Sequence, residues 1–307
     1  MKDKIAMKRK SDKMIDLHMH TNFSDGTDTS IEILEKAQNK ALEVISITDH
    51  NTAKVYEAME KIDVKKYYNG EIIPGIELNT KVLGIPIEIL GYGIDYKKMN
   101  EMLKEVYIPA EERNKIEVSR LYAKCIKSGI KLEENCIEHY DSSMFASKFI
   151  QGEIQKFEEN KSIISEDAWN DTRIFYRKYM SNPECALYVE MDDFVPDFDR
   201  AANLIREVGG LVFIPHIFEY RENAKRILGY ILENYEIDGI ECYYTTFSEE
   251  QTNEVIAVCK KHDLYMSGGS DYHGKAKPNV DMGSGFGNLF IDNEIIEEWK
   301  DKVKYYR

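Results

Sequence analysis

The chain has 307 residues with 55 acidic and 41 basic side chains, and its formal charge of −14 disfavours non-specific binding to duplex DNA. No apolar run is long enough to span a bilayer, and the lysine-rich residues 1–13, which we expect to form a flexible basic tail, lack the apolar segment of a signal peptide. Five scattered cysteines without a Cys-x-x-Cys spacing argue against a disulfide framework and favour a cytoplasmic protein.

The first predicted strand covers residues 14–20, where apolar and polar side chains alternate. His18 and His20 then project from the same face of this strand, and Asp25 follows in a Ser-Asp-Gly turn. Two imidazoles and one carboxylate suit a divalent cation. A pair of half-buried histidines on a polar strand face is the alternative, and this stretch alone does not decide between them.

Helices and strands alternate in the next part of the chain. Thr29 and Glu32 form a capping-box pattern that starts a helix, and the apolar run at residues 44–50 predicts a buried strand that ends in Asp49 and His50. Further elements are expected at residues 53–61 (helix), 71–80 (strand, with Glu77 inside it) and 85–93 (strand). This alternation indicates a parallel sheet with crossover helices.

The pattern changes at residues 96–193, where charged residues interleave with apolar ones at helical spacing. We interpret this segment as a helical insertion domain within an α/β domain formed by residues 14–95 and 194–307. The rhythm of strands and helices returns after the insertion. We expect helices at residues 198–207, 223–234, 249–262 and 293–303, and strands at residues 211–216, 237–244, 264–273 and 288–291.

Metal-capable side chains recur at the ends of five predicted strands. They are His18 and His20, Asp49 and His50, Glu77, His216, and Asp271 with His273. The carboxyl ends of the strands of a parallel α/β barrel converge on one face, where barrel active sites lie. Each residue has an ordinary explanation when taken alone: His50 as a surface residue, Glu77 as an exposed strand end, His216 as a hydrogen-bonded core residue. Their recurrence in a chain with seven histidines favours one common metal site.

Four ordered motifs resemble the polymerase and histidinol phosphatase (PHP) family. They are Asp-Leu-His-Met-His-x4-Asp-Gly at residues 16–26, Ile-Thr-Asp-His at 47–50, Pro-Gly-Ile-Glu at 74–77 and Gly-Ser-Asp-Tyr-His-Gly at 269–274, with Pro215-His216 in register. The resemblance covers residues 14–285 and implies a distorted seven-stranded β/α (TIM-like) barrel of the PHP type with two or three divalent metal ions, manganese, iron or zinc. The helical insertion resembles that of the stand-alone phosphoesterase branch of the family.

The resemblance also implies which side chains hold the ions. It assigns His18, His20, Glu77 and Asp271 to one position, Glu77 and His216 to a second, and Asp25, His50 and His273 to a third. Glu88 departs from the family pattern, because stand-alone members commonly have a histidine of the second position there. Glu88 either ligates through oxygen, which favours manganese or iron over zinc, or is a surface residue. The number of ions, two or three, therefore stays open.

The same resemblance suggests how hydrolysis would proceed. A hydroxide that bridges two ions would attack phosphorus in line. Arg113 and Lys277 match the family's candidate phosphate-binding positions, although either could equally be a solvated surface residue. Asp49 and His273 are candidate donors of a proton to the leaving oxygen, and Asp49 is an equal candidate for orienting a ligand histidine.

We therefore predict a cytoplasmic metal-dependent phosphoesterase that hydrolyses small phosphate monoesters, with nucleotides (nucleoside bisphosphates or oligonucleotide ends) as the leading class. A histidinol-phosphate phosphatase is the nearest alternative in the family. Two alternatives come from other classes: a non-catalytic metal- or nucleotide-binding protein, favoured if Glu88 binds no ion, and a metal-dependent C–N hydrolase, in which a carboxylated lysine would replace Glu77. We expect no membrane partner, and the sequence does not indicate an oligomeric state.

Overall fold

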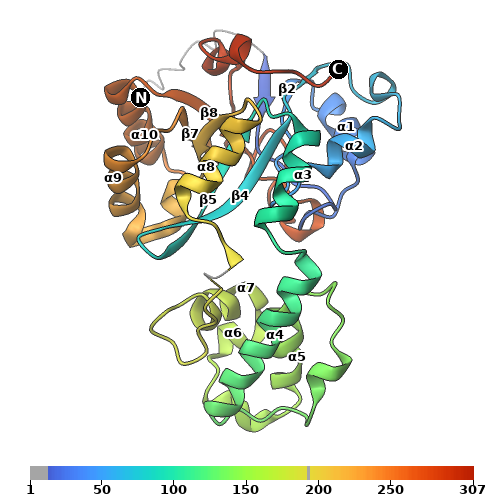
Figure 1. The fold of residues 1–307 in the computed structure, drawn as a ribbon, viewed down its shortest axis with the longest axis vertical. Coiled ribbons are helices and arrows are strands. Elements are labelled where there is room, and N and C mark those ends of the chain that lie inside the picture. The colour runs from blue at the N-terminus through green and yellow to red at the C-terminus, as the bar shows by residue number, and fades with distance from the viewer. Residues whose placement is uncertain (1–12, 192–193) are drawn as a thin grey trace, which may run out of the picture. The chain divides into compact units, whose positions relative to one another are not determined.

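The computed structural model describes residues 13–191 and 194–307 of the chain (Figure 1). These residues form two compact units, one of residues up to Leu103 together with Pro196–Arg307, the other of Lys104–Val195. The chain passes from the first unit to the second inside helix α3 (Tyr96–Val106). The expected tail at residues 1–13 lies outside the described residues except for Lys13, whose ammonium is 3.0 Å from a carboxylate oxygen of Glu43.

The strands of the described residues all belong to the first unit. They are β1 (Met14–Asp16), β2 (Leu42–Ile45), β3 (Glu71–Ile72), β4 (Gly75–Val82), β5 (Ile85–Tyr92), β6 (Leu211–Ile214), β7 (Gly239–Tyr244) and β8 (Tyr265–Gly269). The other helices of this unit are α1 (Ser30–Asn39), α2 (Lys54–Met59), α8 (Phe198–Glu207), α9 (Ala224–Asn234) and α10 (Glu249–His262). Helix α8 packs across β4, β5 and β6, and α10 packs against β7 and β8 (Figure 1).

The strands form two sheets. The first is parallel with the order β1–β2–β3, and the second has the order β4–β5–β6–β7–β8. In the second sheet β6, β7 and β8 run parallel, but β5 is antiparallel to both β4 and β6, so the expectation of a parallel sheet is wrong at β5. The reason is the two-residue turn Leu83-Gly84, in which both residues have positive φ (55° and 73°), as in a type I′ hairpin.

The described residues do not form the closed seven-stranded barrel that we expected. Pro74 divides the expected strand at residues 71–80 into β3 and β4, because a proline nitrogen cannot donate to a ladder. The two sheets meet through isolated pairings of Met19 with Tyr272 and of His50 with Glu77. The structure thus confirms a mixed α/β fold with two separate sheets.

Helix α1 begins as the sequence predicts. Thr29 Oγ1 accepts a hydrogen bond from the N–H of Glu32 (3.3 Å), and Glu32 Oε2 accepts one from the N–H of Thr29 (2.8 Å). The helix then buries Ile33, Leu34 and Ala37 on one face. Helices α8 and α10 have the predicted limits, because each combines a capping residue with an apolar face of regular spacing.

The expected strand at residues 288–291 and helix at residues 293–303 do not form. Two short 3₁₀ turns, Asn293–Ile296 and Lys300–Lys302, take the place of the helix. The apolar residues of this segment therefore do not form the face of a helix.

Trp299 of this segment packs into the core of the first unit, where it is fully buried. Its ring stacks on Tyr92 with centroids 5.5 Å apart, and its indole N–H donates to the carbonyl of Met266 (2.9 Å). Burial of such a large aromatic side chain contributes strongly to the stability of this core.

The second unit contains α4 (Ala110–Lys127), α5 (Ala146–Gln155), α6 (Glu166–Asn170) and α7 (Thr172–Phe175), and its described residues include no strand. Leu121, Ile150 and Phe175 are fully buried in an apolar core that belongs to this unit. None of the helices in the described part of the chain has the length and apolar character that a membrane span requires.

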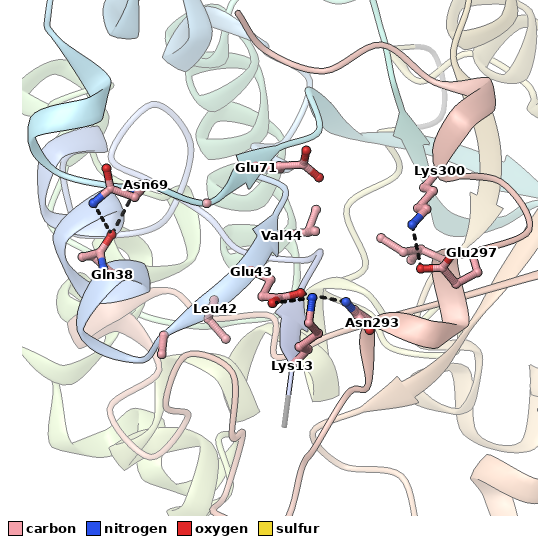
Figure 2. A pocket seen from close by; sticks show the side chains of 13 residues that line it. Lys13, Gln38, Leu42, Glu43, Val44, Asn69, Glu71, Asn293, Glu297 and Lys300 are labelled. Atoms are coloured by element: carbon pink, nitrogen blue, oxygen red, sulfur yellow. Dashed lines mark hydrogen bonds and ion pairs between the residues drawn. The ribbon is translucent and has the colours of Figure 1, made fainter. Parts of the chain in front are cut away.

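A cavity of about 570 Å³ opens at the amino ends of β2 and β3 (Figure 2). Charged side chains that line it are paired with one another, Lys13 with Glu43 at 3.0 Å and Lys300 with Glu297 at 2.6 Å. None of the predicted site residues lines this cavity. The predicted metal ligands lie elsewhere in this unit, most of them beyond the carboxyl ends of strands.

Candidate metal centre

The nine predicted metal ligands come together in the first unit, seven of them beyond the carboxyl ends of β1, β2, β6 and β8 and two, Glu77 and Glu88, inside β4 and β5. They are His18, His20, Asp25, His50, Glu77, Glu88, His216, Asp271 and His273, and they form four overlapping groups in which the potential ligand atoms lie within 4.8 Å of one another. Six of the nine are buried, while Asp25, His50 and Glu88 remain partly exposed. Five of the chain's seven histidines belong to this cluster.

Glu77, on β4, is the centre of the cluster and is 1% exposed. Its Oε2 lies 3.2 Å from Nε2 of both His18 and His20 and 3.4 Å from Nδ1 of His50. Its Oε1 lies 2.9 Å from Nε2 of His216. One carboxylate thus faces four imidazoles, two oxygens in two directions, which is the arrangement expected of a group that bridges two cations.

Asp271 follows β8 and presents one oxygen to the histidines. Its Oδ1 lies 3.6 Å from Nε2 of His18 and 3.4 Å from Nε2 of His20. Its Oδ2 accepts hydrogen bonds from the Tyr244 hydroxyl (2.8 Å) and from the Lys277 ammonium. Asp271 also has a positive φ of 57°, an uncommon conformation that is found where a site fixes its backbone. The other oxygen is thereby fixed toward His18 and His20.

Asp25 gathers three histidines on the more exposed side of the cluster. Its carboxylate oxygens lie 3.2 Å from Nε2 of His273, 3.5 Å from Nδ1 of His20 and 3.7 Å from Nε2 of His50. Nδ1 of His273 donates to the carbonyl of Asp271 (2.8 Å), which leaves the lone pair on Nε2 directed at this group.

Asp49 lies beside the cluster and holds the loop that carries Asp25. Its carboxylate accepts hydrogen bonds from the N–H (2.7 Å) and hydroxyl (2.6 Å) of Thr21 and from the hydroxyl of Ser24 (2.6 Å). These hydrogen bonds run to the loop and not to a histidine. They favour a positioning part for Asp49 over donation of a proton to a substrate.

Glu88, on β5, lies next to the cluster. Its Oε2 is 3.6 Å from Nε2 of His216, and its Oε1 is 4.0 Å from Nδ1 of His50. With His50 and Glu77 it forms one of the four groups whose ligand atoms converge. Its side chain is 30% exposed, so it borders the cluster on the solvent side.

Glu241, on β7, is a site residue that the sequence analysis missed. It is fully buried, its Oε1 accepts from Nδ1 of His18 (2.9 Å), and its Oε2 accepts from the backbone N–H of His216 (2.8 Å). A carboxylate behind a ligand histidine fixes the ring and leaves Nε2 free for a metal. A lone glutamate inside the apolar strand at residues 237–244 is the signal that could have revealed it.

Asp16, at the end of β1, joins the segments that carry the candidate ligands. It is fully buried and accepts hydrogen bonds from the N–H (2.9 Å) and hydroxyl (2.6 Å) of Ser270 and from the N–H of Gly283 (2.7 Å). Burial raises the pKa of Asp16, and these hydrogen bonds counteract part of that rise. Asp16 therefore ties the His18 strand to the segment of Asp271.

The cluster places mutually compensating charges in a buried region. Burial opposes a charge on His20, but the nearby carboxylates of Asp271, Glu77 and Asp25 outweigh burial and raise its pKa to about 10. Burial likewise opposes ionisation of Glu77, but the charges of His18 and His50 outweigh it and hold the pKa of Glu77 well below its usual value. Without a metal, protons on the imidazoles balance the carboxylates, so a divalent cation would replace protons here.

The donor atoms of the cluster fit divalent metal ions. His20 Nε2, His50 Nδ1 and His216 Nδ1 are buried ring nitrogens without a hydrogen-bond partner among the described residues. A buried polar atom without a partner is costly, and the first two of these nitrogens face Oε2 of Glu77, where a cation would satisfy both. Imidazole and carboxylate together suit manganese, iron and zinc.

The two candidate phosphate-binding residues have different surroundings. Lys277 lies beside the cluster, with its ammonium on Asp271 and its side chain 36% exposed. Arg113 lies on α4 of the second unit, and its charge counteracts part of the burial-driven rise in the pKa of Glu117. Of the two residues, Lys277 contacts the metal centre, through Asp271.

Comparison with known proteins shows which proteins this chain is similar to. The family model described as PHP domain matches residues 16–182, more than half of the chain. The chain is 25% identical to a 5′-3′ exoribonuclease of Haemophilus influenzae over 94% of this chain and 98% of the relative, and 25% identical to a 3′,5′-nucleoside bisphosphate phosphatase of Chromobacterium violaceum over 88% and 90%. A solved structure of a phosphoesterase candidate from Bifidobacterium adolescentis has the same fold, with a TM-score of 0.67, 20% identity and coverage of 96% and 98%.

Proposed function

Because this chain belongs to the PHP family and is a metal-dependent phosphoesterase of that family, we propose that it hydrolyses small phosphate monoesters of nucleotides at the cluster around Glu77. The observation that carries this proposal is the convergence of five histidines and three further carboxylates around the buried Glu77 carboxylate, from segments far apart in the sequence. Such a set supplies ligands for two or three divalent ions.

We assign the ligands by proximity. His18, His20 and Asp271 surround one position, Glu77 joins it to a second with His216 and Glu88, and Asp25, His50 and His273 surround a third. Divalent ions bound there would polarise the phosphoryl oxygens and lower the pKa of a water molecule to near neutrality. Glu241 holds the His18 side chain in place for that purpose.

Lys277 is the residue best placed to bind the phosphoryl group from the protein side. Its ammonium, 36% exposed, already contacts Asp271, so it can neutralise a phosphoryl oxygen without leaving the cluster. His273 donates from Nδ1 to a backbone carbonyl, and burial together with the charge of His20 lowers its pKa. A neutral ring with a free Nε2 suits a metal ligand better than a proton donor.

A nucleotide is favoured over other phosphate esters by a feature of the loop that carries Asp25. Phe23 is 39% exposed and lies two residues before Asp25, in a loop fixed by Thr21, Ser24 and Asp49. An exposed aromatic ring on a rigid loop beside a phosphate-binding centre suits stacking on a nucleobase. The two curated relatives named above also act on nucleotide substrates by their names.

The experiment is a phosphate-release screen on protein purified without chelator. The panel contains nucleoside 3′,5′-bisphosphates, mononucleotides, a 5′-phosphorylated oligonucleotide and histidinol phosphate, and a separate assay of amine release from an amide substrate tests C–N hydrolysis. We expect manganese-dependent release from the nucleotide members and little from the others. Preferred hydrolysis of histidinol phosphate or of the amide would replace the proposed substrate class, and absence of turnover with every member would support a binding protein.

A further inference from the structure

Tyr220 contacts both the backbone and the side chain of Glu88. It lies in the 3₁₀ turn Ile217–Asn223, directly after His216, whereas Glu88 lies on β5. Its hydroxyl oxygen accepts a hydrogen bond from the N–H of Glu88 (2.9 Å), and the hydroxyl donates to Oε2 of Glu88 (3.4 Å). Since a tyrosine hydroxyl has one proton, acceptance from the amide directs that proton toward the carboxylate.

The same carboxylate oxygen faces the metal centre. Oε2 of Glu88 lies 3.6 Å from Nε2 of His216, and Oε1 lies 4.0 Å from Nδ1 of His50. The Tyr220 ring lies beside the His216 ring, with centroids 6.1 Å apart. Tyr220 therefore holds Glu88 by hydrogen bonds from one side, and the two histidines lie near its oxygens on the other.

The backbone around Tyr220 is strained in a way that requires such a contact. His216 has φ 26° and ψ 46°, and Arg221 has φ 49° and ψ −121°. Non-glycine residues adopt such angles only where surrounding contacts hold them, and they cluster at functional sites. The hydrogen bonds to Glu88 are contacts of that kind, because they join the strained turn to β5.

We infer that Tyr220 is a positioning residue that holds Glu88 as an oxygen ligand of the position it shares with His216, and that this pair shifts the selectivity of the position toward Mn²⁺ relative to Zn²⁺. The inference rests on the proposed function, because it assumes that the cluster binds metal. The physical reason is ligand type: a fixed carboxylate adds a hard oxygen donor to the position, and oxygen-rich positions favour manganese relative to zinc. A carboxylate free to turn into solvent would not contribute, and the position would then depend on His216 and Glu77.

A double-mutant cycle tests the inference: Tyr220→Phe, Glu88→Gln and the combination, with Tyr230→Phe on α9 as the matched control. Mn²⁺ is titrated into chelator-treated protein, with affinity read from competition with a metal-binding dye and the ligand field read from the Mn²⁺ EPR spectrum. We expect Tyr220→Phe and Glu88→Gln each to weaken the weakest-bound Mn²⁺ by about 10- to 100-fold. The combination should be no weaker than Glu88→Gln alone, since Tyr220 acts through Glu88.

A second arm uses Glu88→His, which should shift preference at this position from Mn²⁺ toward Zn²⁺. Wild-type affinity in Tyr220→Phe, full additivity in the combination, or unchanged binding in Glu88→Gln would each overturn the inference. The melting temperature of each metal-free variant is measured as well, and a fall in Tyr220→Phe with unchanged Mn²⁺ affinity would assign Tyr220 a structural part only. Phosphate release by wild type and Tyr230→Phe is scored separately, because loss of hydrolysis would refute the proposed function while the affinity cycle still tests Tyr220.

Discussion

Glu241→Gln is the substitution whose effect follows most directly from the geometry of the centre. The Glu241 carboxylate accepts from Nδ1 of His18 (2.9 Å) and from the N–H of His216 (2.8 Å). Glutamine keeps the volume but offers one acceptor oxygen, so one of these two buried donors loses its partner and faces an amide NH₂ group. We expect a loss of about 1–3 kcal/mol in the free energy of unfolding of the metal-free protein.

The effect on function should be larger than the effect on folding. Substitution of a group that orients a metal-ligating histidine typically lowers metal affinity or activity by about 10- to 100-fold. The assay measures bound metal by elemental analysis, phosphate release at saturating Mn²⁺, and urea unfolding in the presence of chelator. Full recovery of turnover at high Mn²⁺ would indicate that Glu241 acts on affinity alone.

Glu254→Gln on α10 is the matched control for this substitution. It makes the same chemical change at an exposed ion pair with Lys225 (2.9 Å). Such pairs contribute about 0–1 kcal/mol, so stability and turnover should stay near wild type. Wild-type metal content and turnover in Glu241→Gln would refute the conclusion that Glu241 orients His18.

Three further predictions concern the base subsite, the charge balance and the core. Phe23→Ala should raise KM for nucleotides and leave KM for ribose 5-phosphate unchanged; an equal rise for both would contradict base stacking. Because the pKa of His20 is raised to about 10, its protonation stabilises the metal-free fold fully below a pH of about 6.5 and progressively less as the pH rises to about 10. The melting temperature in chelator should therefore fall over that pH range, and a melting temperature that does not change with pH would contradict this prediction. Tyr56→Phe should lower the free energy of unfolding, measured in urea, by about 2–5 kcal/mol, because the N–H groups of Ile47 (3.1 Å) and Gly75 (2.8 Å) lose the hydroxyl that accepts from them. A loss below about 1 kcal/mol would show that the two amides find other partners.

Local sequence patterns predicted helices α1, α8 and α10 well, whereas the strands expected at residues 14–20, 44–50, 211–216 and 264–273 extend beyond the observed ends of β1, β2, β6 and β8. The capping box at Thr29 and the apolar spacing of residues 198–207 and 249–262 are determined within a few residues, so they needed no tertiary information. The pairing partners of β5 could not be predicted in the same way, because they depend on how a hairpin and a distant strand meet. Trp299 shows the same limit of local patterns, because it packs into a core formed by residues distant in the sequence and the expected C-terminal helix does not form.

The candidate site could be predicted where residues present unusual chemistry at strand ends. The structure brings His18, Glu77 and Asp271 together although they lie far apart in the sequence, since Glu77 alone comes 59 positions after His18. Crossover connections between strands produce such long-range contacts. Glu241 could not be predicted as readily, because its significance lies in contacts with His18 and His216 that no local pattern encodes. The ion pair of Lys277 with Asp271 could not be predicted from the sequence either, because it depends on the conformation of the turn after β8.

The most direct test of the central claim combines metal analysis with phosphate release in wild type and Asp271→Asn. Protein is purified without chelator, analysed for manganese, iron and zinc, and assayed on a nucleoside bisphosphate before and after metal removal. We predict two or three bound ions in wild type, loss of phosphate release on chelation, recovery with Mn²⁺, and fewer ions with no recovery in Asp271→Asn. Phosphate release that survives complete metal removal, or equal metal content and turnover in Asp271→Asn, would contradict hydrolysis at this centre.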